Sequence, residues 1–232
     1  MRGESEKLIR LAKFFVPFII SIVGILVLQY TVGEASSAKL LILMMAYFFP
    51  PLGKESIIPI GVSGGVITNP ITGYVSIVPS INPIIMALSI AFIDIVVALF
   101  LVWNYDFATK IPFVGKFMIK VEEKGKNVEE KYGWIKPLRF IGIMLFVMIP
   151  FQGSGGLVGS IVGRLIGMKP LNTFLAISFG AVIGCLLIAM FSQVFLIFAG
   201  INTALTLIMI GIIVISIIAY IVIKKRRKKK LL

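Results

Sequence analysis

The chain has 232 residues, of which 59% are hydrophobic, and its mean hydropathy is +1.05. This apolar share exceeds that of an ordinary soluble domain and predicts a single integral membrane domain over residues 1–232. The net charge of +13 does not indicate a nucleic-acid partner, because 19 of the 23 Lys and Arg residues lie beside apolar segments, in residues 2–13, 110–139 and 224–230. With no histidine and one cysteine, Cys185, the chain lacks the usual catalytic and metal-binding groups, so we expect no enzyme activity, metal ion or cofactor.

Four apolar segments are long enough to span a bilayer, whose hydrocarbon core takes roughly 20 helical residues. The first follows a basic start and has no clear small-residue cleavage site after it, so we predict a retained helix rather than a signal peptide. The four segments are Leu11–Tyr30, Pro83–Asn104, Leu171–Ala199 and Asn202–Ile223. We therefore predict an all-α polytopic membrane protein with four spanning helices.

Two further apolar segments are interrupted near their centres by proline, glycine and polar residues. The first break is Pro50–Glu55 and the second is Pro150–Gly156. The arms beside each break are too short to span the membrane, and such lengths are typical of re-entrant segments. Because broken helices occur at membrane depth only where protein or a water-filled cavity receives their backbone, we predict two re-entrant helical hairpins, at residues 40–67 and 138–168.

The basic clusters also predict the orientation of the chain. Under the positive-inside rule the N-terminus, the amphipathic segment 105–137 and the basic tail 224–232 are cytoplasmic, which indicates a multi-pass protein of the cell (plasma) membrane. The first half, residues 11–104, and the second half, residues 138–223, then place their hairpins on opposite sides of the membrane, as an inverted repeat would. Residues 68–82 are rich in turn formers and predict an external loop.

Glu55 and Asp94 are the two acidic residues that fall within membrane segments, where carboxylates are rare and usually functional. Glu55 begins a half-helix beside Lys54. It is either a proton-coupling or cation-coordinating group, or a helix cap paired with a neighbouring cation. Asp94 lies near the centre of a spanning segment, with no local helix end to cap. An ion pair with Lys54 or Arg164 and a proton site are both open for Asp94.

The second break combines backbone amides with small residues. Its turn opens a half-helix, and the free N–H groups there suit an anion such as a phosphate headgroup. Arg164, two turns later, is either an anion partner or a side chain that snorkels to the cytoplasmic face. Glycine recurs every four residues, at Gly155, Gly159, Gly163 and Gly167, and the last three predict a packing face. The turn itself consists of Gln152, Gly153, Ser154, Gly155 and Gly156.

At these two breaks the sequence resembles the small multidrug export protein family and, more distantly, the DedA-like (VTT) membrane proteins. In order and spacing the resemblance covers about residues 40–200. The DedA-like resemblance implies two re-entrant hairpins that face each other and a proton-dependent movement of lipid-linked phosphates or phospholipids. Glu55 matches the acidic residue of their first hairpin, whereas Gln152 and Ser154 stand where their second hairpin carries arginines. The stretches that carry the resemblance are Gly53–Gly61, Pro150–Gly159 and Leu165–Met168.

Together these patterns predict a secondary transporter or lipid scramblase, coupled to protons or a monovalent cation. A small-molecule or lipid substrate would pass a midplane site between the hairpins, with Glu55, and Asp94 beside it, as the coupling group and the turn 152–156 facing them. The alternative is a non-transporting membrane factor that organises lipids or partner proteins, and a channel is also open. Membrane lipids are the expected surroundings, and the sequence leaves open whether the chain forms a homo-oligomer.

Overall fold

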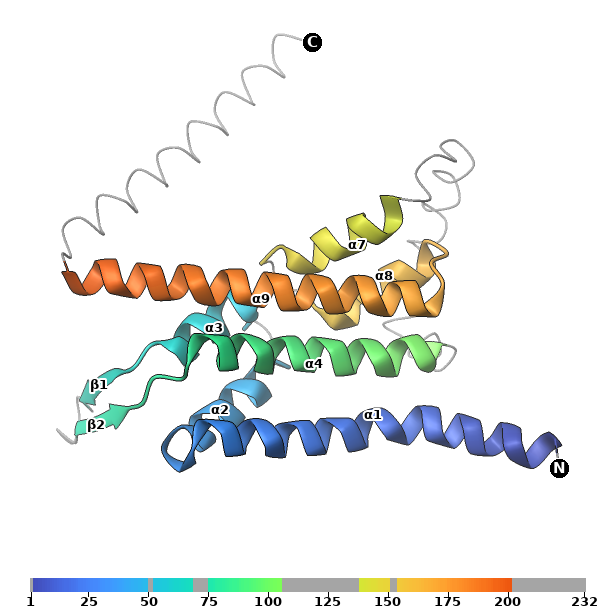
Figure 1. Cartoon of the computed structure of the whole chain (residues 1–232), viewed down its shortest axis with the longest axis horizontal. Helices are drawn as coiled ribbons and strands as arrows, with labels where there is room; N and C mark the ends of the chain where they lie inside the picture. The colour runs from blue at the N-terminus through green and yellow to red at the C-terminus, as the bar shows by residue number, and fades with distance from the viewer. Residues whose placement is uncertain (1, 50–51, 69–74, 106–137, 151–153, 202–232) are drawn as a thin grey trace, which may run out of the picture. The chain divides into compact units, whose positions relative to one another are not determined.

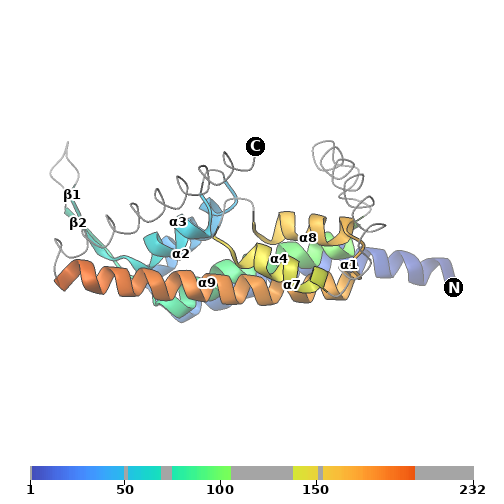
Figure 2. The same ribbon diagram turned by 90° about the horizontal axis from the view of Figure 1, so that it is seen from above.

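The computed structural model is drawn as a ribbon in Figures 1 and 2. Backbone contacts group Met1–Met190 into one unit and Phe191–Leu232 into another, and the architecture that follows is that of the first unit. The part of the chain that the structure describes forms seven helices and one short β-hairpin. The described residues are 2–49, 52–68, 75–105, 138–150 and 154–201.

Among the described residues, three helices are long and apolar enough to cross a membrane. They are α1 (Arg2–Val32), α4 (Pro83–Trp103) and α9 (Pro170–Ile201). Three of the four predicted spanning segments therefore form such helices. The fourth, Asn202–Ile223, lies outside the described residues, as do residues 106–137 of the predicted amphipathic segment and the basic tail.

Helix α4 is the central helix of the unit. Asn82 caps its start, because the side-chain oxygen accepts a 2.9 Å hydrogen bond from the N–H of Ile84, and Pro83 occupies the first helical position, where a missing N–H costs nothing. In the most apolar stretch of α4, 56% of the residues are buried, compared with 6% in α1. Protein therefore surrounds α4, whereas α1 presents most of its apolar surface outward.

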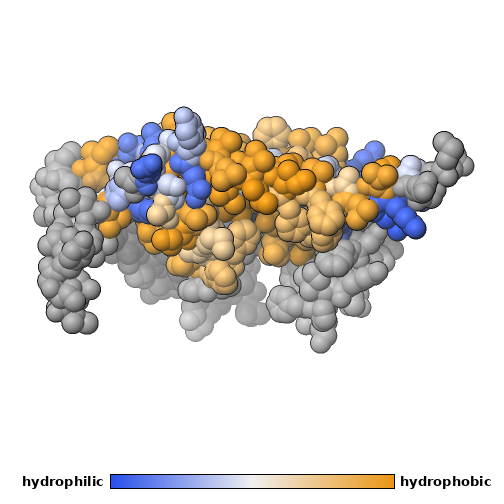
Figure 3. Space-filling view, turned by 90° about the horizontal axis from the view of Figure 1, so that it is seen from below, coloured by the Kyte–Doolittle hydropathy of each residue, from blue (hydrophilic) through white to orange (hydrophobic). Residues whose placement is uncertain are grey.

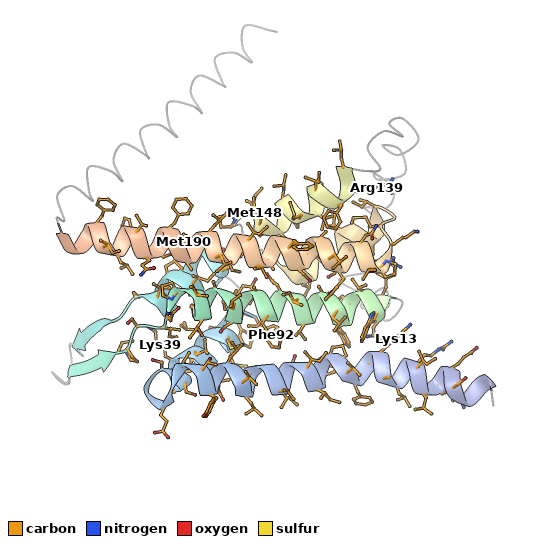
Figure 4. The ribbon with its side chains drawn as sticks, in the orientation of Figure 1. Lys13, Lys39, Phe92, Arg139, Met148 and Met190 are labelled. Carbon is orange, nitrogen blue, oxygen red and sulfur yellow. The ribbon has the colours of Figure 1, made fainter. Side chains whose placement is uncertain are left out.

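Helix α1 runs antiparallel to α4. Gly24 of α1 lies against the ring of Phe92, where a Cβ atom would come within 2.1 Å of the ring. Near the other end of the contact, the side-chain amide of Asn104 donates a 3.0 Å hydrogen bond to the carbonyl oxygen of Lys13. Figure 4 labels Phe92 and Lys13 along this contact.

The first pair of short helices, α2 (Glu34–Ala46) and α3 (Lys54–Val62), doubles back at the first break. The ammonium of Lys39, early in α2, donates hydrogen bonds to the carbonyl oxygens of Gly61 (3.1 Å) and Ser63 (2.6 Å) at the end of α3. The ends of the two helices that lie away from the break are therefore held together, and they are called the open end of the pair. Their other ends meet at the break.

The predicted boundaries after α3 need a correction. The arm predicted to reach Ile67 ends as a helix at Val62, and β1 (Gly65–Thr68) follows and pairs antiparallel with β2 (Val75–Val78), with Gly65 opposite Val78. Glycines 64 and 65 disfavour continuation of the helix, and six of the eight strand residues are β-branched, which favours strands. Part of the loop predicted at 68–82 is thus a β-hairpin.

In the second pair, α7 (Leu138–Met148) runs parallel to the first part of α9. Gly180 of α9 faces Met144, and a Cβ atom there would lie 2.4 Å from the Met144 carbonyl oxygen. One turn later, Gly184 faces Met148 in the same way, at 2.7 Å. The two helices pack closely because α9 has glycine at these positions.

Helix α8 (Gly156–Leu165) runs antiparallel to the same stretch of α9, so α7 and α8 also double back. Gly163 lies against Thr173, near the start of α9, and Gly159 lies against Ile177, one turn further on. Both glycines belong to the predicted packing face.

Gly167 has a different role from these two glycines. It ends α8 with a positive φ of 76°, which favours glycine, and its N–H donates to the carbonyl oxygen of Arg164 at 3.0 Å. The N–H of Met168 donates to the carbonyl oxygen of Gly163 at 3.1 Å, which completes a Schellman motif. Gly167 is therefore needed for its backbone conformation.

The two short-helix pairs approach the middle of α4 from opposite ends, as Figures 1 and 2 show. At the N-terminal end of α4, Gly61 of the first pair lies against Met86 and accepts a 3.0 Å hydrogen bond from the N–H of Ile81. At the C-terminal end, the guanidinium of Arg164 in the second pair lies 5.0 Å from the ring centre of Tyr105. On the face seen in Figure 3, hydrophobic side chains form a broad band with hydrophilic ones on either side.

Candidate functional site

The two helix breaks meet at Asp94, in the middle of α4. Asp94 is the twelfth of the 21 residues of α4 and is 3% exposed. Its Oδ1 atom accepts a 3.0 Å hydrogen bond from the hydroxyl of Tyr47, beside the first break, and a 2.7 Å hydrogen bond from the N–H of Gly156, beside the second. One carboxylate therefore joins the ends of both helix pairs.

Asp94 acts as a cap for a helix far away in the sequence. Gly156 is the first residue of α8, and its N–H is one of the donors that have no partner within their own helix. A carboxylate at this position also compensates the positive end of the helix dipole. The sequence indicated that Asp94 had no local helix end to cap, and the structure supplies one from another segment.

The glycines at the start of α8 allow this approach. A Cβ atom on Gly156 would lie 2.1 Å from the backbone oxygen of Asp94, and one on Gly155 would lie 2.7 Å from its Oδ1 atom and 2.9 Å from the hydroxyl of Tyr47. All three distances are below those of real Cβ contacts. Two adjacent residues without side chains are thus required for the backbone to reach the carboxylate.

Lys54 is the cation of the site. It is the first residue of α3, it is 1% exposed, and its ammonium donates a hydrogen bond to the carbonyl oxygen of Val147 in the last turn of α7. A cation there compensates the negative end of the α7 dipole. The ammonium is also close enough to the carboxylate of Asp94 to attract it. Hereafter Tyr47, Lys54, Asp94, Val147 and Gly156 are called the break junction.

Glu55 lies beside the break junction. It is the second residue of α3, and its carboxylate folds back over Gly53, where a Cβ atom would lie 2.3 Å from one oxygen. Its other oxygen, Oε2, is buried, and the described residues provide it with no hydrogen-bond donor. Glu55 also acts electrostatically on Tyr47. Tyr47 thus lies within electrostatic range of both carboxylates, and its hydroxyl donates its hydrogen bond to Asp94.

The structure places the remaining predicted site residues as follows. Gln152 and Gly153 lie outside the described residues. The hydroxyl of Ser154 donates a 2.6 Å hydrogen bond to the carbonyl oxygen of Ile149, which closes the second break on itself. Arg164 lies away from the break junction, where its guanidinium donates a 2.8 Å hydrogen bond to the carbonyl oxygen of Met168.

The sequence reasoning missed three groups, two of them at the break junction and one, Lys39, at the open end of the first pair. The sequence feature that could have indicated Tyr47 is its polar aromatic side chain three positions before Pro50. Lys39, which holds the open end of the first pair, is a lone charge in an apolar stretch and carries the same kind of signal. The carbonyl oxygen of Val147 has none, because every residue has one.

The described residues contain no group of three or more His, Cys, Asp or Glu side chains that could hold a metal ion. The acceptors that the break junction offers are carboxylate, phenol and carbonyl oxygens. Such oxygens bind protons, ammonium groups and hard cations.

The sequence pattern of one protein family, described as "Putative small multi-drug export protein", matches residues 58–187. This range covers more than half of the chain and contains Asp94, Val147 and Gly156, but begins just after Lys54 and Glu55. The comparison with curated proteins and the comparison with solved structures found no match. With its three long apolar helices, the chain is a membrane protein in a lipid environment. The more distant DedA-like resemblance stays a prediction from the sequence.

Proposed function

Because this chain belongs to the small multi-drug export protein family, we propose that it is a secondary transporter whose substrate passes the break junction. The substrate is a small molecule or a lipid, in which case the transport is lipid scrambling, and movement is coupled to a proton or a monovalent cation. The observation that carries this proposal is the meeting of both helix breaks at one buried carboxylate, Asp94. Broken helices around a polar centre are the usual design of a transporter site.

Helix geometry supports a site near the membrane midplane. At about 1.5 Å per residue, α4 is about 31 Å long, and Asp94 lies about 16 Å from its start. A hydrocarbon core is about 30 Å thick. Helix α7, with 11 residues, reaches about 16 Å, roughly half of that thickness. The length of α7 therefore suits one arm of a re-entrant hairpin that ends near the midplane.

The polar contacts of the break junction support alternating access. Among the described residues, the second pair is joined to the rest of the site by hydrogen bonds from Lys54 to Val147 and from Gly156 to Asp94. Movement of the α7–α8 pair against both α3 and α4 would break both bonds. In inverted-repeat transporters such rocking about a central site opens it to each side in turn.

The orientation belongs to the same proposal. With the N-terminus, residues 105–137 and the tail 224–232 in the cytoplasm of a multi-pass plasma-membrane protein, the open end of the first pair faces outward and that of the second pair faces inward. The protein would bind no nucleic acid and catalyse no covalent reaction. The break junction is built within one chain, so the proposed site does not depend on the oligomeric state.

Glu55 is the coupling residue in this scheme, because it is the carboxylate whose buried oxygen has no donor among the described residues and whose side chain is only partly buried. The test is Glu55→Gln in proteoliposomes that contain a pH dye, with ethidium as the probe substrate. We expect ethidium-dependent proton flux in the unaltered protein and its loss in the variant. Glu34→Gln, which removes an exposed acid, is the matched control and should retain flux. Unaltered flux in Glu55→Gln, with normal expression and melting temperature, would refute the assignment of Glu55 as the coupling residue.

The alternative, a non-transporting factor that organises lipids or partner proteins, is favoured by one observation. Lys54 and Asp94 each cap a helix end, which is a sufficient structural reason for a buried charge. On this alternative, Asp94→Asn and Glu55→Gln would lower the melting temperature, and no flux would depend on either residue.

A further inference from the structure

The break junction and Glu55 carry an excess of negative charge. Lys54, Glu55 and Asp94 are the ionisable groups with full charge in this cluster, and with all three ionised the cluster has one net negative charge. Uncompensated charge away from water is costly, so buried charges are normally paired. One further positive charge would make the cluster neutral.

The hydrogen bonds show where that positive charge would sit. Oδ1 of Asp94 and the carbonyl oxygen of Val147 already accept hydrogen bonds. Oδ2 of Asp94 and Oε2 of Glu55 are both buried, and among the described residues neither receives a hydrogen bond. Asp94 itself is 3% exposed. A buried acceptor without a donor calls for an explanation, such as a ligand that fills it.

The same contacts argue against an anionic ligand. The sequence suggested that free N–H groups at the start of α8 would hold a phosphate headgroup. The N–H of Gly156 instead binds the carboxylate of Asp94, so an internal anion already occupies this helix terminus. A phosphate here would meet two carboxylates, and Lys54 would be the one opposing charge among the described groups of the cluster.

Resting on the proposed function, we propose that the break junction binds one monovalent positive charge at Oδ2 of Asp94, favoured by the charge of Glu55 beyond Tyr47, and that the ligand or coupling ion of this protein is therefore cationic. The shared chemistry is a single positive charge, which a proton, Na⁺ or a small organic ammonium supplies. The tethered ammonium of Lys54 competes with such a ligand, since its charge attracts the carboxylate of Asp94.

The groups that face Asp94 define what a change of pH would act on. They are Tyr47 from α2, Lys54 from α3, the N–H of Gly156 from α8 and Cys185 from α9, with Glu55 beyond Tyr47. Tyrosine, cysteine and lysine ordinarily titrate above pH 8. An effect of pH between about 6 and 8 that is absent in Asp94→Asn is therefore assigned to the carboxylate of Asp94.

The experiment measures the melting temperature of the full-length protein in detergent as a function of added NaCl, tetramethylammonium chloride or sodium phosphate, the last compared with NaCl at equal Na⁺ concentration, and of pH between about 8 and 6. We expect stabilisation by one of the cations or by protons and none by phosphate. Lys54→Met, which removes the competing charge, should strengthen the apparent affinity for that cation, or for protons, about tenfold. Asp94→Asn and Glu55→Gln should each weaken it by a similar factor.

Lys169→Met is the matched control, because Lys169 is exposed and lies outside the cluster, and it should leave the affinity unchanged. If Lys54→Met does not fold, Glu55→Gln at its partly exposed position decides the test. Binding of phosphate that is weakened in Lys54→Met would overturn the inference and leave transport standing. A lack of response to all cations and to pH would overturn it as well. Cation binding without any Glu55-dependent flux would keep the site and remove the transport function.

Discussion

The carboxylate of Asp94 accepts a 2.7 Å hydrogen bond from the backbone N–H of Gly156, 62 positions later in the chain. Asp94 lies mid-helix in α4, and Gly156 is the first residue of α8. The bond thus fixes the start of a half-helix against the middle of a spanning one. A movement of the second helix pair relative to α4 has to break this hydrogen bond, so substitutions at this contact test the fold most directly.

Gly156→Ala should destabilise the protein. The added Cβ atom would lie 2.1 Å from the backbone oxygen of Asp94, and a backbone atom cannot give way as a flexible side chain can. Overpacking of this kind costs about 1–3 kcal/mol, so we expect a fall of several degrees in the melting temperature.

Gly142→Ala is the matched control. Gly142 is an exposed glycine inside α7, and a Cβ atom there would meet nothing within 4 Å. Alanine favours a helix interior over glycine by up to about 1 kcal/mol, so this variant should be as stable as the unaltered protein or slightly more so. Equal melting temperatures of the two variants would contradict the close approach of α8 to α4.

The helix breaks could be predicted from sequence because their cause is local. Proline, glycine and charge interrupt two apolar segments, and the structure has helix ends at both places, at Ala46 and Lys54 and at Met148 and Gly156. The start of α4 at Asn82 and Pro83 has an equally local cause. The strands after Val62 were missed because an apolar run of β-branched residues reads equally well as a helix arm.

The partners across the site could not be predicted, because each one joins distant segments. The sequence predicted that the free N–H groups at the start of α8 would suit an anion such as a phosphate headgroup, whereas the N–H of Gly156 donates to the protein's own Asp94. Lys54 and Arg164 were equal candidates to pair with Asp94, and only the fold separates them. The carbonyl oxygen of Val147 accepts a hydrogen bond from Lys54 because α7 ends beside Lys54. The residue type at position 147 gives no indication of this contact.

Tyr47→Phe should lower stability without disrupting the fold. The phenol donates a 3.0 Å hydrogen bond to Oδ1 of Asp94, and its removal leaves the ring in place. Hydrogen bonds to charged groups contribute about 1.5–3 kcal/mol, and part of that remains because Gly156 still donates to the same oxygen. We expect a fall in the free energy of unfolding of about 1–2 kcal/mol.

Tyr30→Phe is the control for this loss, since Tyr30 is 90% exposed. Thermal denaturation of both variants under the same conditions makes the comparison. If Tyr47→Phe had the same melting temperature as Tyr30→Phe, the hydroxyl of Tyr47 would not be bonded to Asp94.

Lys39→Met should loosen the open end of the first helix pair. The ammonium of Lys39 donates to three carbonyl oxygens, those of Gly61, Ser63 and Pro79, at 3.1, 2.6 and 2.9 Å. At roughly 0.5–1.5 kcal/mol for each bond, the loss is about 2–4 kcal/mol. Amide hydrogen exchange should show where this stability is lost, because exchange should accelerate more at the end of α3 and at the N–H of Ile81 than elsewhere.

Lys169→Met removes an exposed lysine and should change neither quantity. Figure 4 shows where Lys39 lies between α2 and the strands. Exchange that accelerates uniformly over the chain, with no focus on residues 60–81, would mean that Lys39 does not hold this end of the pair.

The two helix pairs should open to opposite sides of the membrane. Ser80 lies beyond the open end of the first pair and Lys169 beyond that of the second, and both are exposed. Single-cysteine variants Ser80→Cys and Lys169→Cys, in a Cys185→Ala background, test this with a maleimide that does not cross membranes. Because the basic clusters place Lys169 in the cytoplasm, only Ser80→Cys should react in intact cells, and Lys169→Cys should react once the inner face is exposed.

This result would link the contacts along α4 to the membrane. Gly61 against Met86 and Arg164 over Tyr105 already place the two open ends at opposite ends of one helix. If α4 spans the bilayer, those ends cannot share a side, and the meeting point at Asp94 has to lie between them. Labelling of both cysteines from one side would require α4 to lie along the membrane, and the break junction would then no longer be a route across it.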